Sequence, residues 1–82
     1  MPRLPVVSGG RLIQFMESHG YAVVRQRGSH VRLRLRLQNA AGVWFETVPN
    51  HDEVAKGTLR SILRRMSQAT KQTVDQLIGQ LG

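Results

Sequence analysis

The chain has 82 residues, a formal net charge of +7 and no cysteine, so it fits one small domain over residues 1–82 and excludes a disulfide framework. Ten of its twelve basic residues are arginine, whose planar guanidinium binds phosphate through two parallel hydrogen bonds. The composition therefore favours a nucleic acid as partner, ahead of an acidic protein and then an anionic membrane.

The first predicted element is a helix from Ser8 to His19. Ser8 is a good N-cap, and Gly20 suits the position just after the helix. Leu12, Met16 and His19 lie on one stripe of such a helix, which predicts that this face is turned toward a core.

Two strands are predicted next, joined by the turn pair Gly28-Ser29. Tyr21–Arg27 is rich in β-forming residues, and Val31–Leu37 alternates strictly between apolar residues and arginine. Side chains of a strand point alternately to its two faces, so one face is expected in the core and the other in solvent. The expected core residues are Val31, Leu33, Leu35 and Leu37, and the expected solvent residues are His30, Arg32, Arg34 and Arg36.

A further turn is predicted at Gln38–Gly42, followed by a third strand over Val43–Val48 that Pro49 ends. The alternation breaks at Trp44 and Phe45, so the sequence leaves open which face each of them occupies. Three strands with short connections indicate an antiparallel meander.

Two helices complete the pattern. The first begins near Lys56 or Thr58, and the second, near Val74–Leu81, is capped by Thr73 with Gln76 or by the earlier Thr70. Apolar residues at helical spacing mark their buried faces, namely Leu59, Ile62, Leu63 and Met66, then Val74, Leu77, Ile78 and Leu81. The opposite side of the helix that begins near Lys56 or Thr58, the second helix of the chain, carries Arg60, Arg64 and Arg65.

The order α-β-β-β-α-α predicts an α+β fold, with a three-stranded antiparallel sheet and helices on only one of its faces. Double-stranded RNA-binding domains have this layout. The arginine-rich side of the second strand then lies on the uncovered face, where a histidine beside guanidiniums suits a phosphate backbone. The alternative is a solvated strand face whose arginines only prevent edge-to-edge pairing.

Other classes of site are not expected from this sequence. The three histidines have no paired ligand spacing and there is no cysteine, so we predict no metal site and no cofactor. No apolar run approaches membrane-spanning length and the start lacks the apolar core of a signal peptide, so we expect a cytoplasmic protein without a membrane partner.

Four segments, in order and spacing, resemble the HicA (YcfA-like) family of bacterial toxin ribonucleases. They are Val7–Gly9, then Gly20-Tyr21 with Val24–His30, then Thr47–Pro49 with His51, and last Lys56–Leu63. The resemblance rests on the four segments occurring together in this order. The resemblance covers most of residues 7–66.

The resemblance implies a fold similar to double-stranded RNA-binding domains, cleavage of mRNA and inhibition by a HicB antitoxin. The family's catalytic histidine corresponds to His30. The chain departs from the family where Met66–Gln72 replaces a shorter turn that contains glycine, and the strand after His30 is unusually rich in arginine.

The strand pattern and the family resemblance both indicate candidate site residues. His30 is the candidate general base or acid at a ribose 2′-hydroxyl, and His51 is a candidate second proton-transfer group, each with an ordinary surface histidine as the alternative. Trp44, Tyr21 and Phe45 either stack on bases or pack in the core, and His19 is expected to be structural. The predicted RNA-binding residues are Arg25, Arg27, Ser29, Arg32, Arg34, Arg36, Lys56 and Arg60.

The sequence thus predicts a metal-independent endoribonuclease toxin of a type II toxin–antitoxin pair, with RNA and a HicB-type antitoxin as partners. A non-catalytic RNA-binding module of the same fold and a basic adaptor for an acidic protein are the alternatives. The group around the second helix (Lys56, Arg60, Arg64 and Arg65) is either a second phosphate contact or a solvated face.

Overall fold

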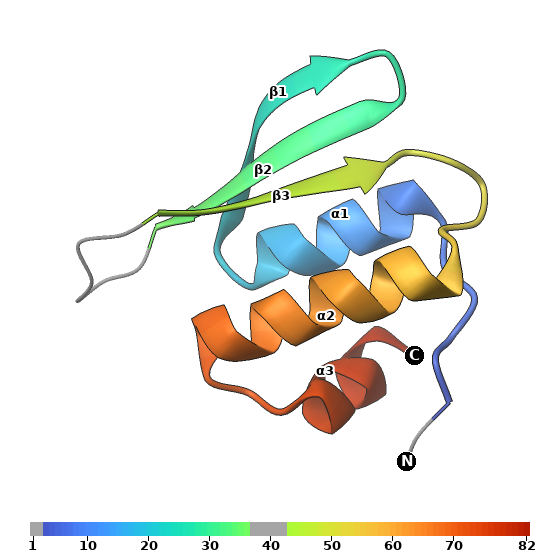
Figure 1. Ribbon diagram of the computed structural model, residues 1–82, viewed down its shortest axis with the longest axis vertical. Coiled ribbons are helices and arrows are strands. Elements are labelled where there is room, and N and C mark those ends of the chain that lie inside the picture. Colours follow the sequence, from blue (N-terminus) through green and yellow to red (C-terminus); the bar gives the residue numbers. More distant parts are fainter. Residues whose placement is uncertain (1–2, 37–42) are drawn as a thin grey trace.

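The computed structural model describes residues 3–36 and 43–82, and it confirms the predicted α-β-β-β-α-α order (Figure 1). The elements are α1 (Gly9–Ser18), β1 (Tyr21–Arg27), β2 (His30–Arg36), β3 (Val43–Pro49), α2 (Lys56–Thr70) and α3 (Val74–Leu81). The expected turn at Gln38–Gly42 and the expected core residue Leu37 lie outside the described residues.

The strands form one antiparallel sheet in the order β1-β2-β3, and the helices lie on one of its faces (Figure 1). Val31, Leu33 and Leu35 of β2 are buried in the core that the helices complete, as the alternation predicts. We call the opposite side of the sheet the outer face. The α+β layout similar to double-stranded RNA-binding domains is therefore confirmed.

Local signals explain where α1 begins and ends and where α3 begins. The Ser8 hydroxyl accepts a hydrogen bond from the Arg11 backbone N–H at 3.0 Å, and Gly20 follows α1 with a φ of 95°. Thr73 and Gln76 form a capping box at the start of α3, which decides between the two predicted caps. No helix within the described residues is long and apolar enough to cross a bilayer.

β1 contains an irregularity that the sequence pattern did not predict. Val23 pairs with Leu33 and Arg25 pairs with Arg32, so Val24 is an extra residue in β1. Such a bulge shifts the side-chain alternation by one position. Without it Arg25 would share a face with Tyr21, which is buried, whereas with it Arg25 shares the outer face with Arg32.

A buried carboxylate joins the sheet to α2. Glu46 lies on the core side of β3 with 3% of its surface exposed, and Arg65 Nε donates to both of its carboxylate oxygens, at 2.7 and 2.9 Å. Arg65 therefore does not belong to the free cationic side of α2, contrary to the sequence interpretation. A buried carboxylate requires such a partner, because an unpaired charge in a core costs several kcal/mol, roughly 3–5.

Burial raises the pKa of Tyr21 from its ordinary 10.0 to about 12, and the nearby charge of Glu46 adds to the effect. The folded protein favours the protonated, neutral form of Tyr21 more strongly than the unfolded chain does. The free energy of unfolding is therefore independent of this group below pH 10 and falls as pH rises from 10 toward 12. The two-unit difference amounts to about 2–3 kcal/mol. Tyr21 is the only tyrosine, so its ultraviolet absorbance should titrate near pH 12 when folded and near 10 in urea. A folded-state midpoint near 10 would contradict this prediction.

Lys71 ends α2 in the left-handed region, with a φ of 61°. This is the segment in which the chain lacks the glycine expected from the family resemblance. The left-handed conformation costs a residue with a Cβ roughly 1–2 kcal/mol, and glycine avoids this cost. Part of the gain is lost again, because glycine gives the unfolded chain more conformational freedom. Lys71→Gly should therefore raise stability by about 0.5–1 kcal/mol, measured by urea denaturation. Gln68→Gly, at an exposed position inside α2, is the matched control and should lower stability by about 1 kcal/mol.

Candidate functional site

The turn between β1 and β2 places His30 at the first position of β2. Gly28 and Ser29 form a two-residue turn, and Arg27 and His30 pair across it. Gly28 has a φ of 57°, a conformation that glycine adopts without strain and that type II′ turns require at their first central residue. His30 is exposed on the outer face, as the sequence predicts.

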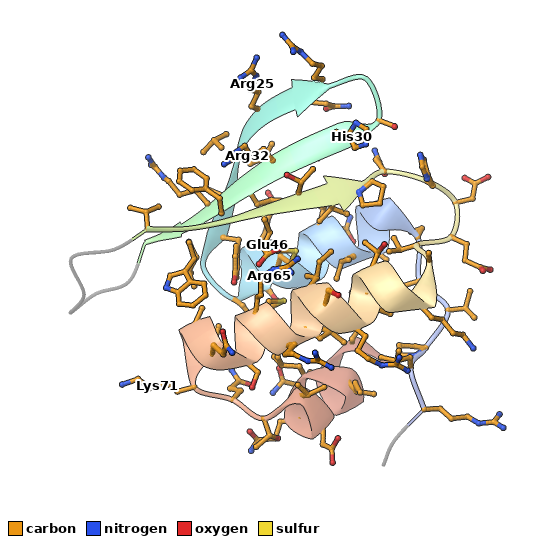
Figure 2. The ribbon with its side chains drawn as sticks, in the orientation of Figure 1. Arg25, His30, Arg32, Glu46, Arg65 and Lys71 are labelled. Atoms are coloured by element: carbon orange, nitrogen blue, oxygen red, sulfur yellow. The ribbon has the colours of Figure 1, made fainter. Side chains whose placement is uncertain are left out.

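Three rows of paired residues cross the outer face next to His30. Because directly paired residues point to the same side of a sheet, the pairing fixes which side chains lie together. The rows are Arg27–His30–Pro49, Arg25–Arg32–Thr47 and Ala22–Arg34–Phe45. Four guanidiniums therefore share this face with one imidazole, and Figure 2 shows Arg25, His30 and Arg32 on the hairpin.

The aromatic residues of β3 divide between the two faces. Trp44 pairs with Leu35 and packs against the core. Phe45 pairs with Arg34, is 46% exposed, and lies under the Arg32 guanidinium, 4.5 Å from ring centroid to Cζ. Tyr21 is buried, so Phe45 is the one residue of the three predicted to stack on bases whose side chain is exposed on the outer face.

The loop after β3 brings His51 to the same turn. His51 Nε2 lies 3.3 Å from the Ser29 hydroxyl, within hydrogen-bonding distance, and the Asn50 backbone N–H donates to the Ser29 carbonyl at 2.6 Å. Ser29 precedes His30, so the structure brings both candidate proton-transfer residues to one end of the sheet. Sequence reasoning proposed His51 by its residue type and because the loop after the third strand could approach the sheet, but it did not predict the contact with Ser29.

Gly9 explains why this loop can reach the turn. The Gly9 backbone N–H donates to the His51 carbonyl at 2.8 Å. A Cβ at Gly9 would lie 2.5 Å from both Asn50 Cα and the Pro49 carbonyl oxygen, closer than real contacts allow. A glycine at this position therefore lets the start of α1 hold the His51 loop against the sheet.

The structure does not bring all the predicted RNA-binding residues together. Lys56 and Arg60 line a separate hollow between the N-terminal segment, α2 and α3, which we call the α2–α3 groove. Arg36 ends β2 opposite Val43, and its side chain is outside what the structure describes. The outer face thus holds Arg25, Arg27, Arg32 and Arg34 from the predicted set, with Ser29 at the adjoining turn.

The chemistry available at the outer face is that of a cationic surface with imidazoles at one end. Guanidiniums bind phosphate oxygens, and an imidazole exchanges protons near neutral pH. In residues 3–36 and 43–82, no three His, Asp or Glu side chains are grouped so that they could hold a metal ion.

Residues 9–68 match the profile of a family described as HicA toxin of bacterial toxin-antitoxin. The match covers more than two thirds of the chain and includes the β1–β2 turn, His30 and His51. The chain belongs to the HicA toxin family. This membership places it in a toxin–antitoxin context, with an antitoxin as partner. The comparisons with curated proteins and with solved structures gave no significant match. α3 and the segment before residue 9 lie outside the matched HicA region.

Proposed function

We propose that this HicA-family toxin is a metal-independent endoribonuclease that cleaves mRNA and so inhibits translation. The observation that carries the proposal is the row of paired sheet residues Arg27–His30–Pro49, beside which the Ser29 hydroxyl lies within hydrogen-bonding distance of His51 Nε2. A polyanionic backbone would lie along the arginines, and the imidazoles at the end of the sheet would exchange protons with it. Ribose supplies the nucleophile, which is why RNA and not DNA is the proposed substrate.

The proposed reaction begins with His30 removing the proton from a ribose 2′-hydroxyl. The 2′-oxygen attacks the adjacent phosphorus, the bond from phosphorus to the 5′-oxygen breaks, and the products are a 2′,3′-cyclic phosphate and a 5′-hydroxyl. His51 protonates the departing 5′-oxygen. Arg25 and Arg32 stabilise the negative charge that develops on the phosphate oxygens.

The proposal is tested by incubating the purified protein with RNA in the presence of a chelator and analysing the fragment ends. We expect fragments with 5′-hydroxyl and 2′,3′-cyclic phosphate ends. Cleavage that requires a divalent cation, or fragments with 5′-phosphate ends, would contradict the mechanism. Tight RNA binding without cleavage would favour the non-catalytic RNA-binding module instead.

His51→Ala tests the second proton-transfer group. We expect cleavage to slow by about 10², at the lower end of the usual range for general acid–base catalysis, because water can also protonate the departing oxygen. The pH–rate profile should lose one of its two limbs, a change that loss of loop structure alone would not produce. Ser29→Ala is the companion variant, and it should slow cleavage less while keeping both limbs. A profile unchanged in His51→Ala would remove His51 from the mechanism.

We also propose that a HicB-type antitoxin silences the protein by covering the outer face with an acidic surface. Four arginines and His30 occupy that face, so one partner surface of opposite charge can exclude RNA and shield the imidazole together. RNA binding by the isolated protein and by the complex would be compared. A complex that binds RNA through the arginines with full affinity would contradict occlusion.

A further inference from the structure

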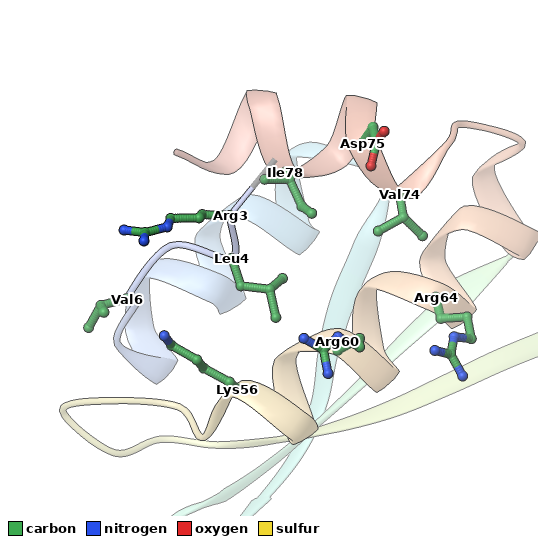
Figure 3. A pocket seen from close by; sticks show the side chains of 9 residues that line it. All are labelled: Arg3, Leu4, Val6, Lys56, Arg60, Arg64, Val74, Asp75 and Ile78. Atoms are coloured by element: carbon green, nitrogen blue, oxygen red, sulfur yellow. The ribbon is translucent and has the colours of Figure 1, made fainter. Parts of the chain in front are cut away.

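The α2–α3 groove is a second candidate binding site, with a volume of about 940 Å³ (Figure 3). None of the described sheet residues contributes to its walls. It is formed by the N-terminal segment, one side of α2 and the first turns of α3, through residues 3, 4 and 6, Lys56, Arg60 and Arg64, and Val74, Asp75 and Ile78. The groove is therefore separate from the outer face and from His30.

Cations dominate the groove. Lys56, Arg60 and Arg64 recur every four residues, so they form a stripe along α2 about 12 Å long, and Arg3 approaches from the N-terminal segment. Among the described residues that line the groove, Asp75 is the single carboxylate, and it lies in the first turn of α3, where the helix dipole favours it. A stripe of this length matches an extended ligand with several negative charges better than one small anion.

The remaining walls are aliphatic. They are formed by Leu4, Val6, Val74 and Ile78. Val6 is 67% exposed, and Figure 3 shows Leu4 and Val74 reaching toward the same space from opposite sides. Burying apolar side chains here would contribute about 25 cal/mol per Å² of surface removed from water. RNA gains little from such walls, because its bases stack on aromatic rings and no aromatic residue stands among the described residues of the groove.

The groove also depends on the segments that the HicA profile does not match. Three of its residues precede residue 9 and three follow residue 68. The long α2 and the left-handed turn at Lys71 set α3 beside the arginine stripe. The stripe itself lies within the matched region, but the aliphatic walls beside it do not.

We propose that the α2–α3 groove binds an acidic peptide segment that carries large apolar side chains, presented by a protein partner. The carboxylates of the segment pair with the α2 stripe, and its apolar side chains cover the aliphatic walls. This binding is independent of the proposed ribonuclease activity and leaves the outer face free for RNA.

The test uses the full chain and a fluorescein-labelled synthetic peptide of glutamate and leucine, with binding followed by anisotropy and by amide chemical shifts. We expect the shift changes to cluster on residues 56–64 and 74–78. Arg60→Gln with Arg64→Gln should weaken binding by roughly 2- to 30-fold, the range for two exposed ion pairs. The matched pair Arg25→Gln with Arg34→Gln removes the same charge from the outer face and should change peptide affinity little.

Two further comparisons separate this proposal from simple attraction between charges. Asp75→Asn should strengthen peptide binding, whereas Asp52→Asn, an equal change of charge on the exposed loop before α2, should not. A peptide with serine in place of leucine should bind more weakly. Equal affinity for the serine peptide, shift changes on the outer face, or displacement of the peptide from the groove by oligouridylate would each overturn the proposal, the last in favour of RNA.

Discussion

Replacing His30 with alanine is expected to abolish RNA cleavage while the protein stays folded and continues to bind RNA. His30 is exposed at the start of β2, so its loss should change stability by no more than the roughly 0.5 kcal/mol usual for surface positions. Alanine cannot accept the 2′-hydroxyl proton, and loss of general acid–base catalysis typically costs about 10² to 10⁴ in rate. Thermal melting, RNA affinity and cleavage would be measured on one preparation, and growth arrest in cells should disappear with cleavage.

His19→Ala is the matched control, because that histidine has a structural role. His19 Nδ1 lies 2.9 Å from the Phe15 carbonyl oxygen and its Nε2 lies 2.8 Å from Gln80 Oε1, so the ring ties the end of α1 to α3. This variant should melt at a lower temperature but cleave at the wild-type rate where it remains folded. If folded His30→Ala protein cleaved RNA at nearly the wild-type rate, the catalytic assignment would be wrong and His51 would be tested next.

The main elements of the fold could be predicted because local signals and packing agree. The alternation of Val31–Arg36 identifies the buried and the solvent side of β2 before any partner strand is known, and the structure has both as expected. Ser8, Gly20 and Thr73 act through backbone geometry within a few residues of themselves, so their positions alone indicate helix ends.

Features that depend on pairing between distant residues could not be predicted in the same way. The bulge at Val24 decides the face of Arg25, but a run of β-forming residues looks the same with or without it. The ion pair between Arg65 and Glu46 joins residues on different elements. A helical projection places Arg65 with the free cations of α2, because it contains no information about the carboxylate that β3 buries.

The candidate site shows the same division. His30 follows from the alternating strand and from the family resemblance, whereas the contact between His51 and Ser29 depends on how α1 holds the loop after β3. The distribution of cations over two surfaces also appears only in the folded chain. The sequence places Lys56 and Arg60 among the predicted RNA-binding residues together with the strand arginines, and the structure separates them.

Neutralising the outer face is expected to weaken RNA binding strongly and to reduce its dependence on salt. Arg25, Arg32 and Arg34 replaced together by glutamine should lower affinity by roughly 10²- to 10³-fold, since each lost hydrogen bond to phosphate costs about 1 kcal/mol net. Each lost phosphate contact also lowers the number of counterions that are released when RNA binds. The slope of log affinity against log salt should therefore become less steep by about 2 for single-stranded RNA. Binding isotherms at several salt concentrations, with RNAs of different sequence, would measure both quantities. The loss should be similar for every sequence, because contacts to phosphate do not distinguish bases.

The control for this experiment removes the same charge from the other surface. Lys56, Arg60 and Arg64 replaced together by glutamine lower the net charge by the same amount, so a general effect of charge would appear equally in both triple variants. We expect this control to keep nearly the wild-type salt slope, because the α2–α3 groove lies apart from the outer face. If instead it reduced the slope as much as the outer-face variant, RNA would contact both surfaces. The peptide proposed for the groove would then compete with RNA, and cleavage by His30 would depend on a binding surface larger than the outer face.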